Sequence, residues 1–143
     1  DQKLLHFING LDKDAYRYWG AFDSTPLIDA KNDTMYECGE NGILYCVKLN
    51  TSFDVNAGTI SINPETLKYR YTSPLLKRPG MENSIAVYKN LGYFVDNTGY
   101  LHCVDLNTLT PVWIRFVNDD TDSTVALEVI DDNKVYLYTA HYA

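Results

Sequence analysis

The amino-acid sequence predicts an all-β protein built from repeated four-stranded antiparallel units. The segment 42–51, Gly-Ile-Leu-Tyr-Cys-Val-Lys-Leu-Asn-Thr, returns 57 positions later at 99–108, with Gly, Leu, Cys, Val, Leu, Asn and Thr identical. Such a close internal copy indicates a repeat architecture. Short segments of alternating polarity lie between turn signals, and no window has the spacing of an amphipathic helix.

The first complete unit covers residues 24–72. Its first three predicted strands are short and end at turn residues: 25–30, 34–38 and 43–49. The turn between the second and third is Glu40-Asn41-Gly42. After a polar loop at 50–57, we expect the segments 59–62 and 67–71 to supply the fourth strand, with a turn at 63–65 between them.

The second unit, residues 83–117, follows a linker-like connection at 73–82 and repeats the same order. Its predicted strands are 84–89, 92–96, 100–106 and 112–117. Partial units flank the two: residues 1–23 are the end of a preceding one, and 123–143, with strands at 124–130 and 135–141, begin another. We treat 1–143 as a single partial domain.

Composition excludes some classes of partner. The net charge is −7 and no cluster of Lys or Arg stands out, so a nucleic-acid surface is not expected. No apolar run approaches the length of about 20 residues that spans a bilayer. The 12 Tyr suit half-buried sheet positions and adaptable contacts with a partner.

Three cysteines, an odd number, argue against a disulfide framework. Cys46 and Cys103 hold equivalent places in the repeat, on the face that carries Leu44 and Leu101, and are predicted to be buried small side chains. Cys38 lies on the strand that pairs with Cys46. A two-residue turn pairs positions that sum to 83 and a three-residue loop pairs positions that sum to 82, so neither register sets these two sulfurs opposite each other.

Four short antiparallel strands with a turn glycine between the second and third are typical of a β-propeller blade. Cys103, Asp105, Thr108 and Trp113 follow one another at fixed spacings, with Leu109 directly after Thr108. This pattern resembles the PQQ-like (quinoprotein) repeat, whose blade motif is Ala-x-Asp-x-x-Thr-Gly-x-x-x-Trp, with Leu109 in place of Gly. A weaker copy is Ser61, Asn63, Thr66 and Tyr71, with Leu67 in that place.

The resemblance implies roles for these residues. Trp113 and Tyr71 would dock against a neighbouring blade, and Asp105 and Asn63 would close the turn that precedes them. The absence of the turn glycine puts the turn geometry in question, because leucine does not readily adopt a positive φ. The resemblance also implies a location outside the cytoplasm, periplasmic or secreted.

Catalysis is not expected within this chain. Quinoprotein dehydrogenases hold pyrroloquinoline quinone (PQQ) and Ca²⁺ between a Trp and a pair of adjacent cysteines, and this sequence has no adjacent cysteines. We therefore assign no catalytic, cofactor-binding or metal-binding residue. His6, His102 and His141 are scattered, and His102 stands where the first copy has Tyr45, which indicates a packing position.

The acidic loop at 118–122 leaves two interpretations open. Asp119, Asp120 and Asp122 have the alternating carboxylates that Ca²⁺ favours, but the loop lacks the glycine and distal glutamate of a known calcium loop. A solvated connection is the more ordinary role of such a charge run.

Propellers close with about four to eight blades, and this chain encodes two and parts of two more. We expect an arc of a longer protein; alternatively, copies associate as a homo-oligomer that completes a ring. The function expected is a non-catalytic scaffold that binds a protein partner or presents a ligand. The alternatives are a fragment of a PQQ-dependent dehydrogenase and a cell-surface polysaccharide-binding module.

Overall fold

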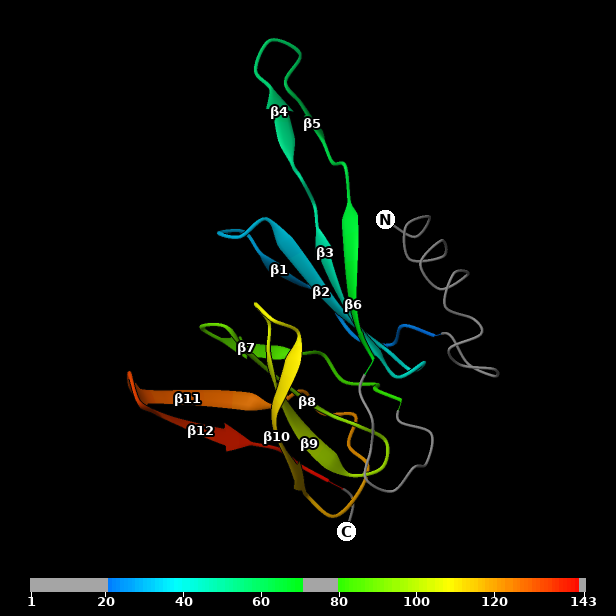
Figure 1. Cartoon of the computed structure of the whole chain (residues 1–143), viewed down its shortest axis with the longest axis vertical. Coiled ribbons are helices and arrows are strands. Elements are labelled where there is room, and N and C mark those ends of the chain that lie inside the picture. The colour runs from blue at the N-terminus through cyan, green and yellow to red at the C-terminus, as the bar shows by residue number, and fades with distance from the viewer. Residues whose placement is uncertain (1–20, 71–79, 142–143) are drawn as a thin grey trace.

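The computed structural model describes residues 21–70 and 80–141, and every regular element in that part is a β-strand (Figure 1). The strands form two four-stranded sheets and two two-stranded hairpins, all antiparallel. This part of the chain confirms the predicted all-β class.

The first sheet has the order β1-β2-β3-β6. Its strands are β1 (Leu27–Asp29), β2 (Thr34–Gly39), β3 (Ile43–Lys48) and β6 (Glu65–Arg70). Cys38 pairs with Leu44, so the hairpin has a three-residue loop, the second of the two registers considered above. Cys46 therefore faces Tyr36 across the strands, and all three cysteines are free and buried.

The second sheet repeats this arrangement with strands in the order β7-β8-β9-β10. They are β7 (Ala86–Tyr88), β8 (Leu91–Val95), β9 (Tyr100–Asp105) and β10 (Thr110–Phe116). β10 carries a bulge between Pro111 and Trp113. Two further strands, β11 (Ala126–Asp131) and β12 (Lys134–Tyr138), pair with each other only, as the first half of another such unit would.

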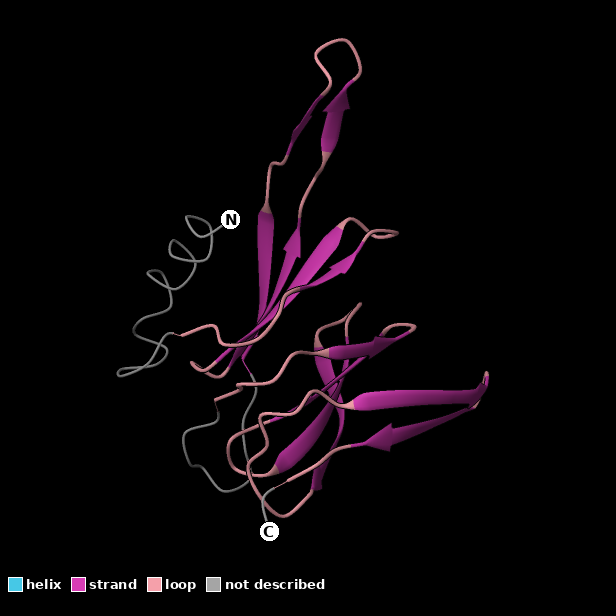
Figure 2. Cartoon of the chain, turned by 180° about the vertical axis from the view of Figure 1, so that it is seen from behind, coloured by secondary structure: helices cyan, strands magenta, loops and turns pink. Residues whose placement is uncertain are grey.

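One predicted strand was wrong. The segment 59–62 does not join the first sheet. Instead β5 (Thr59–Ser61) pairs with β4 (Ser52–Asp54), which lies in the expected polar loop at 50–57, and only β6 supplies the fourth strand of the sheet. The β4–β5 hairpin, which we call the arm, projects beyond the sheet in both views (Figures 1 and 2).

The weaker copy of the blade motif was also wrong. Ser61 belongs to the arm, and Leu67 lies within β6, where it pairs with Cys46 just as Trp113 pairs with Cys103. The place of Trp113 in the first sheet is therefore taken by Leu67. Tyr71 lies outside the described residues. The arm shifts the spacing in this unit, which is why a fixed motif length selects the wrong positions.

The two sheets pack face to face around a common apolar core (Figure 2). The first sheet contributes side chains such as Cys38 and Leu44, and the second contributes Phe94 and Val104. All four residues are 0% exposed. Because side chains alternate along a strand, the opposite face of the second sheet carries Cys103, which packs toward Val125. The second sheet is therefore apolar on both faces.

Cys46 and Cys103 occupy the same place in this scheme. Cys46 belongs to the core that the first sheet shares with the second, and Cys103 to the core between the second sheet and the β11–β12 hairpin. Both are buried, which confirms the prediction. The two copies therefore share their direction of packing as well as their residues. In each copy this cysteine faces the next unit along the chain.

Leu109, where the resembled motif has glycine, has a positive φ. Its φ is +51°, in the left-handed region that costs a non-glycine residue about 1 kcal/mol or more. Its side chain packs against the core between the two sheets, and burial of a leucine offsets a cost of that size. The left-handed conformation at this turn is therefore accommodated by a leucine.

Gly99 offers a test of the β8–β9 turn. Its φ is +81°, and a Cβ there would lie 3.0–3.1 Å from the backbone of Asp119. Gly99→Ala is expected to lower the free energy of unfolding by roughly 2–4 kcal/mol, from the positive φ and from backbone crowding. Urea unfolding measures the loss.

Gly58→Ala is the matched control. Gly58 also has a positive φ, +65°, but nothing lies within 4 Å of its added Cβ, so the expected loss is at most about 1 kcal/mol. Equal losses in the two variants would contradict the role assigned to the Asp119 contact.

Candidate functional site

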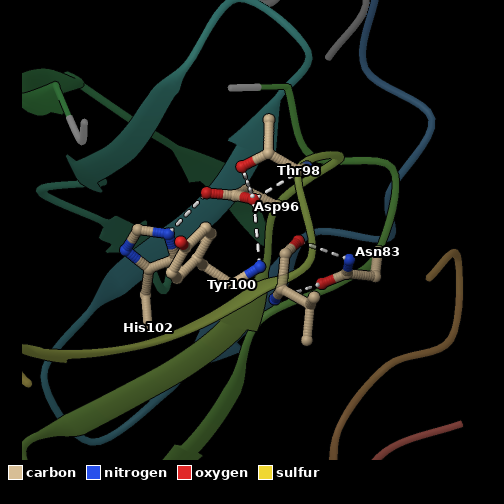
Figure 3. Close-up of polar contacts among 6 residues, drawn as sticks. Asn83, Asp96, Thr98, Tyr100 and His102 are labelled. Atoms are coloured by element: carbon tan, nitrogen blue, oxygen red, sulfur yellow. Dashed lines mark hydrogen bonds and ion pairs between the residues drawn. The ribbon is translucent and has the colours of Figure 1, made fainter. Parts of the chain in front are cut away.

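The most enclosed polar side chains lie where β8 turns into β9 (Figure 3). Asp96 Oδ1 accepts hydrogen bonds from Thr98 N at 2.8 Å, Thr98 Oγ1 at 2.6 Å and Tyr100 N at 3.2 Å. Its Oδ2 lies 2.7 Å from His102 Nε2. An ionised carboxylate only accepts hydrogen bonds, so this nitrogen carries the proton.

The pair is sealed from solvent. The side chains of His102 and Asp96 are 1% and 0% exposed, and the His102 ring stacks on Phe94 with 4.8 Å between centroids and 9° between planes. Burial by itself would raise the pKa of Asp96, but hydrogen bonds from His102 and Thr98 outweigh it and the pKa is lowered. A substrate therefore has no access to either group. Because Asp96 also accepts hydrogen bonds from the backbone of the turn, the role of the pair is to hold the turn in place.

The first sheet uses a similar device with different residues. His102 stands 57 positions after Tyr45. There, Asn41 Nδ2 donates to the Tyr45 hydroxyl at 2.6 Å, and Asn41 Oδ1 accepts from Ile43 N at 3.2 Å. In both units the polar atom of an aromatic side chain on the third strand forms a hydrogen bond with a polar side chain of the preceding turn. His102 therefore has the packing role that the sequence predicted.

Asn83 joins the second sheet to the loop that follows it (Figure 3). Its Nδ2 donates to the carbonyls of Val95, at 2.7 Å, and Thr121, at 2.9 Å, while its Oδ1 accepts from Val95 N. Thr121 in turn donates its hydroxyl to the carbonyl of Ala140. One amide thus positions the acidic loop between β10 and β11 at the turn end of the sheet.

Glu37 is a buried carboxyl with few polar neighbours. Its side chain is 1% exposed, and its Oε1 lies 2.5 Å from Ser24 Oγ, which also lies 3.0 Å from the Cys38 carbonyl. Burial raises the pKa of Glu37 to about 7, with a smaller opposite effect from Ser24. When protonated, Glu37 can donate to Ser24 while Ser24 donates to Cys38.

Further carboxyl groups lie in the loop after β2, in the segment before β7 and in the acidic loop. Burial raises the pKa of Glu40 to about 7, and Asp23 and Glu82 add to the rise. Burial and then the charges of Asp122 and Asp120 raise the pKa of Glu82, which accepts a hydrogen bond from Asn97 at 3.0 Å. Mutual repulsion of this kind favours bound protons over free charges.

The acidic loop is ordered by its contacts with the second sheet. Asp119 lies against Gly99 through its backbone, and burial, followed by the charge of Asp122, raises the pKa of Asp120. Within residues 21–70 and 80–141, no group of three or more His, Cys, Asp or Glu side chains is arranged to hold a metal ion. The Ca²⁺ interpretation of this loop has no support from the described geometry.

The turn role implied for Asp105 is confirmed. Its Oδ1 accepts from Asn107 N at 2.8 Å and Thr108 N at 3.2 Å, closing the turn before β10. Trp113 packs with Leu127 and Leu137 against the core shared with the β11–β12 hairpin, which is the docking position implied for it. His6 lies outside the described residues, and His141 is exposed beyond β12.

Sequence reasoning missed Asp96 and Glu37. Asp96 carries a local signal, because an Asp followed two residues later by Thr is typical of a side chain that caps its own turn. Glu37 has no such signal: its burial depends on packing against distant segments.

No helix in the described part of the chain is long and apolar enough to cross a membrane.

No family model and no curated protein matches this chain. Among solved structures, a europium-containing methanol dehydrogenase resembles it with a TM-score of 0.48 and 13% sequence identity. The match covers 80% of this chain and 23% of that one, so the chain spans about a quarter of the matched protein. At this level of likeness, nothing of that enzyme's activity is transferred.

Removing the Asp96 carboxylate should be costly. Asp96→Ala leaves the buried donors of Thr98 and Tyr100 without their acceptor and removes the partner of His102. We expect a loss of about 3–5 kcal/mol in the free energy of unfolding. Asp131 provides the control, because it accepts from Asn133 N at 2.8 Å in an exposed turn. Asp131→Ala should cost about 1 kcal/mol. Chemical denaturation of both variants checks the difference; comparable losses would contradict the structural role of Asp96.

Glu37 gives the fold a pH dependence. Because its folded-state pKa of about 7 lies above the ordinary 4.5, its stabilising effect is complete below pH 4.5 and is lost as the pH rises through 7. From pH 5 to pH 8 this group should remove about 2–3 kcal/mol from the free energy of unfolding.

Glu37→Gln should flatten this dependence while keeping most of the stability at pH 5. Glu65→Gln, at an exposed position of β6, should leave the wild-type slope unchanged. Unfolding curves at several pH values measure the slopes, and a Glu37→Gln slope equal to that of the wild type would rule out this assignment.

Proposed function

We propose that the chain is a non-catalytic module of PQQ-like propeller repeats that binds a partner protein through the arm. The observation that carries the proposal is an exposed hairpin with one apolar face, hydrogen-bonded at its base to the first sheet, which only one of the two described units has. As part of the same proposal, the module works outside the cytoplasm.

The arm is an insertion in an otherwise repeated unit. Between β9 and β10 the chain makes a tight turn at 106–109, whereas between β3 and β6 it runs from 49 to 64 and forms β4 and β5. The second sheet forms its four strands without the extra hairpin. Insertions on a repeat scaffold lie on its surface and commonly carry its binding function.

The arm has one apolar and one polar face. Phe53 and Ile60 are directly paired and are 60% and 70% exposed, and Val55 beside them is 79% exposed. On the other face Ser52 and Ser61 share a 2.7 Å hydrogen bond. An isolated two-stranded hairpin is marginal in water, so covering its apolar face with a partner is favourable.

The base of the arm is fixed to the first sheet. Asp33, in the turn between β1 and β2, accepts from Thr51 N at 2.7 Å and from Thr51 Oγ1 at 2.6 Å. Asn63 N donates to the Leu49 carbonyl and Asn50 Nδ2 to the Asn63 carbonyl, both at 2.9 Å. Anchoring at both roots lowers the entropy lost when the arm binds.

Photo-crosslinking at single positions tests the proposal. A photoreactive phenylalanine analogue at position 53 should link one recurrent protein partner, whereas the same analogue at position 52, on the polar face, should not. The partner, identified and purified, should bind Phe53→Ser/Ile60→Ser at least tenfold more weakly than the wild type, because central apolar anchors dominate interface energies. Ser52→Ala/Ser61→Ala is the matched control.

Two outcomes would overturn it. Equal affinity of the two double variants for the partner would separate binding from the apolar face. If light scattering shows self-association that Phe53→Ser/Ile60→Ser abolishes, the arm is occupied by a second copy instead. Saturable binding of PQQ with Ca²⁺ would favour the dehydrogenase alternative.

A further inference from the structure

A cleft of about 310 Å³ lies between the second sheet and the β11–β12 hairpin, away from the arm. It opens beside the β7–β8 turn and the β11–β12 turn. Packed interiors leave few voids larger than a water molecule, and ligand sites begin at about 300 Å³. The cleft is therefore large enough for one small ring.

Aromatic side chains form its walls. Trp113, Tyr88 and Tyr93 line it. Tyr93 is only 5% exposed and packs beside Trp113, with 6.1 Å between the ring centroids and 43° between the planes. Trp113 is half-buried, so part of the indole faces the cleft while the rest packs against the hairpin. Such rings offer flat apolar surfaces with polar edges, which suit the C–H face of a pyranose.

Polar groups complete the lining. Asn90 is oriented by a 2.9 Å hydrogen bond from its Nδ2 to Asp105. Asn133 contributes a second amide from the opposite turn. Amides that both donate and accept match the vicinal hydroxyls of a sugar, and a few placed polar groups within an aromatic site fix the orientation of a ligand.

An ion pair bridges the two turns. Lys89 Nζ lies 3.1 Å from the Asp132 carbonyl and 3.3 Å from Asp132 Oδ1, and both residues line the cleft. The pair leaves the described lining without net charge. Together with the chain's net charge of −7, this disfavours an anionic ligand.

We propose that this cleft binds one unit of a neutral saccharide, with its ring against Trp113 and its hydroxyls on Asn90 and Asn133. The site is independent of the arm. Affinity for a single unit of this size is expected near the millimolar range, because a small ligand gains little binding energy per atom. A polymer gains more when several modules engage it at once.

The experiment titrates the chain with neutral trisaccharides of glucose, mannose and galactose. Trp113 is the sole tryptophan in a Trp19→Phe background, so its fluorescence reports the cleft, and the side-chain amide NMR signals of Asn90 and Asn133 report the contacts. At least one sugar should produce saturable changes in both signals. No change with any of the three sugars would overturn the proposal.

Two asparagines give a matched pair. Asn133 and Asn107 each donate a backbone N–H to an aspartate two residues earlier at 2.8 Å, but only Asn133 lines the cleft. Asn133→Ala should weaken binding at least fivefold, and Asn107→Ala should leave it unchanged. Phe53→Ser/Ile60→Ser should also bind the sugar normally.

The remaining outcomes also decide the matter. Equal binding by Asn133→Ala and Asn107→Ala would place the sugar elsewhere and overturn the assignment. A sulfated trisaccharide that binds tenfold more tightly than its neutral parent would overturn the neutral class. Trp113→Phe, which keeps an aromatic ring in the core, should weaken binding while the unfolding transition is retained.

Discussion

The apolar core between two sheets is the interaction on which this structure depends. A sheet with one apolar face needs a single cover, but the second sheet has Phe94 and Val104 on one face and Cys103 on the other. It must therefore be packed between two neighbours. Stacking of this kind needs strands of matched length and register, and an internal copy of the same sequence supplies both.

Acidic residues at the turns serve the backbone. Asp29, Asp54 and Asp105 each accept hydrogen bonds from N–H groups two and three residues later. Asp96 and Asp131 close their turns in a related way. Part of the net negative charge is thus structural, because these carboxylates accept hydrogen bonds from the N–H groups of their own turns.

The sequence predicted this fold where local and repeated signals agree. The hairpin loop at 40–42, the packing direction of Cys46 and the role of His102 all follow from alternation and from the internal copy. The arm escaped prediction because Ser52–Asp54 reads as polar loop, and its strands pair only with each other. Asp105 was recognisable from its turn, whereas the burial of Glu37 depends on contacts that no local pattern encodes.

The two proposed binding elements also differed in how far the sequence alone could predict them. Phe53 and Ile60 are ordinary apolar residues in a sequence, and only their pairing on an unsupported hairpin makes them conspicuous. The sequence marked Trp113 as a docking residue through its motif. That the same indole lines a cleft follows from the angle at which the β11–β12 hairpin meets the second sheet, which depends on tertiary packing.

The anchoring of the arm has a mechanical consequence. Asp33 ties its root to the turn between β1 and β2, while Asn50 and Asn63 tie the two roots to each other. Force applied to the arm would therefore reach the β1–β2 turn as well as β6, which lie toward opposite edges of the sheet.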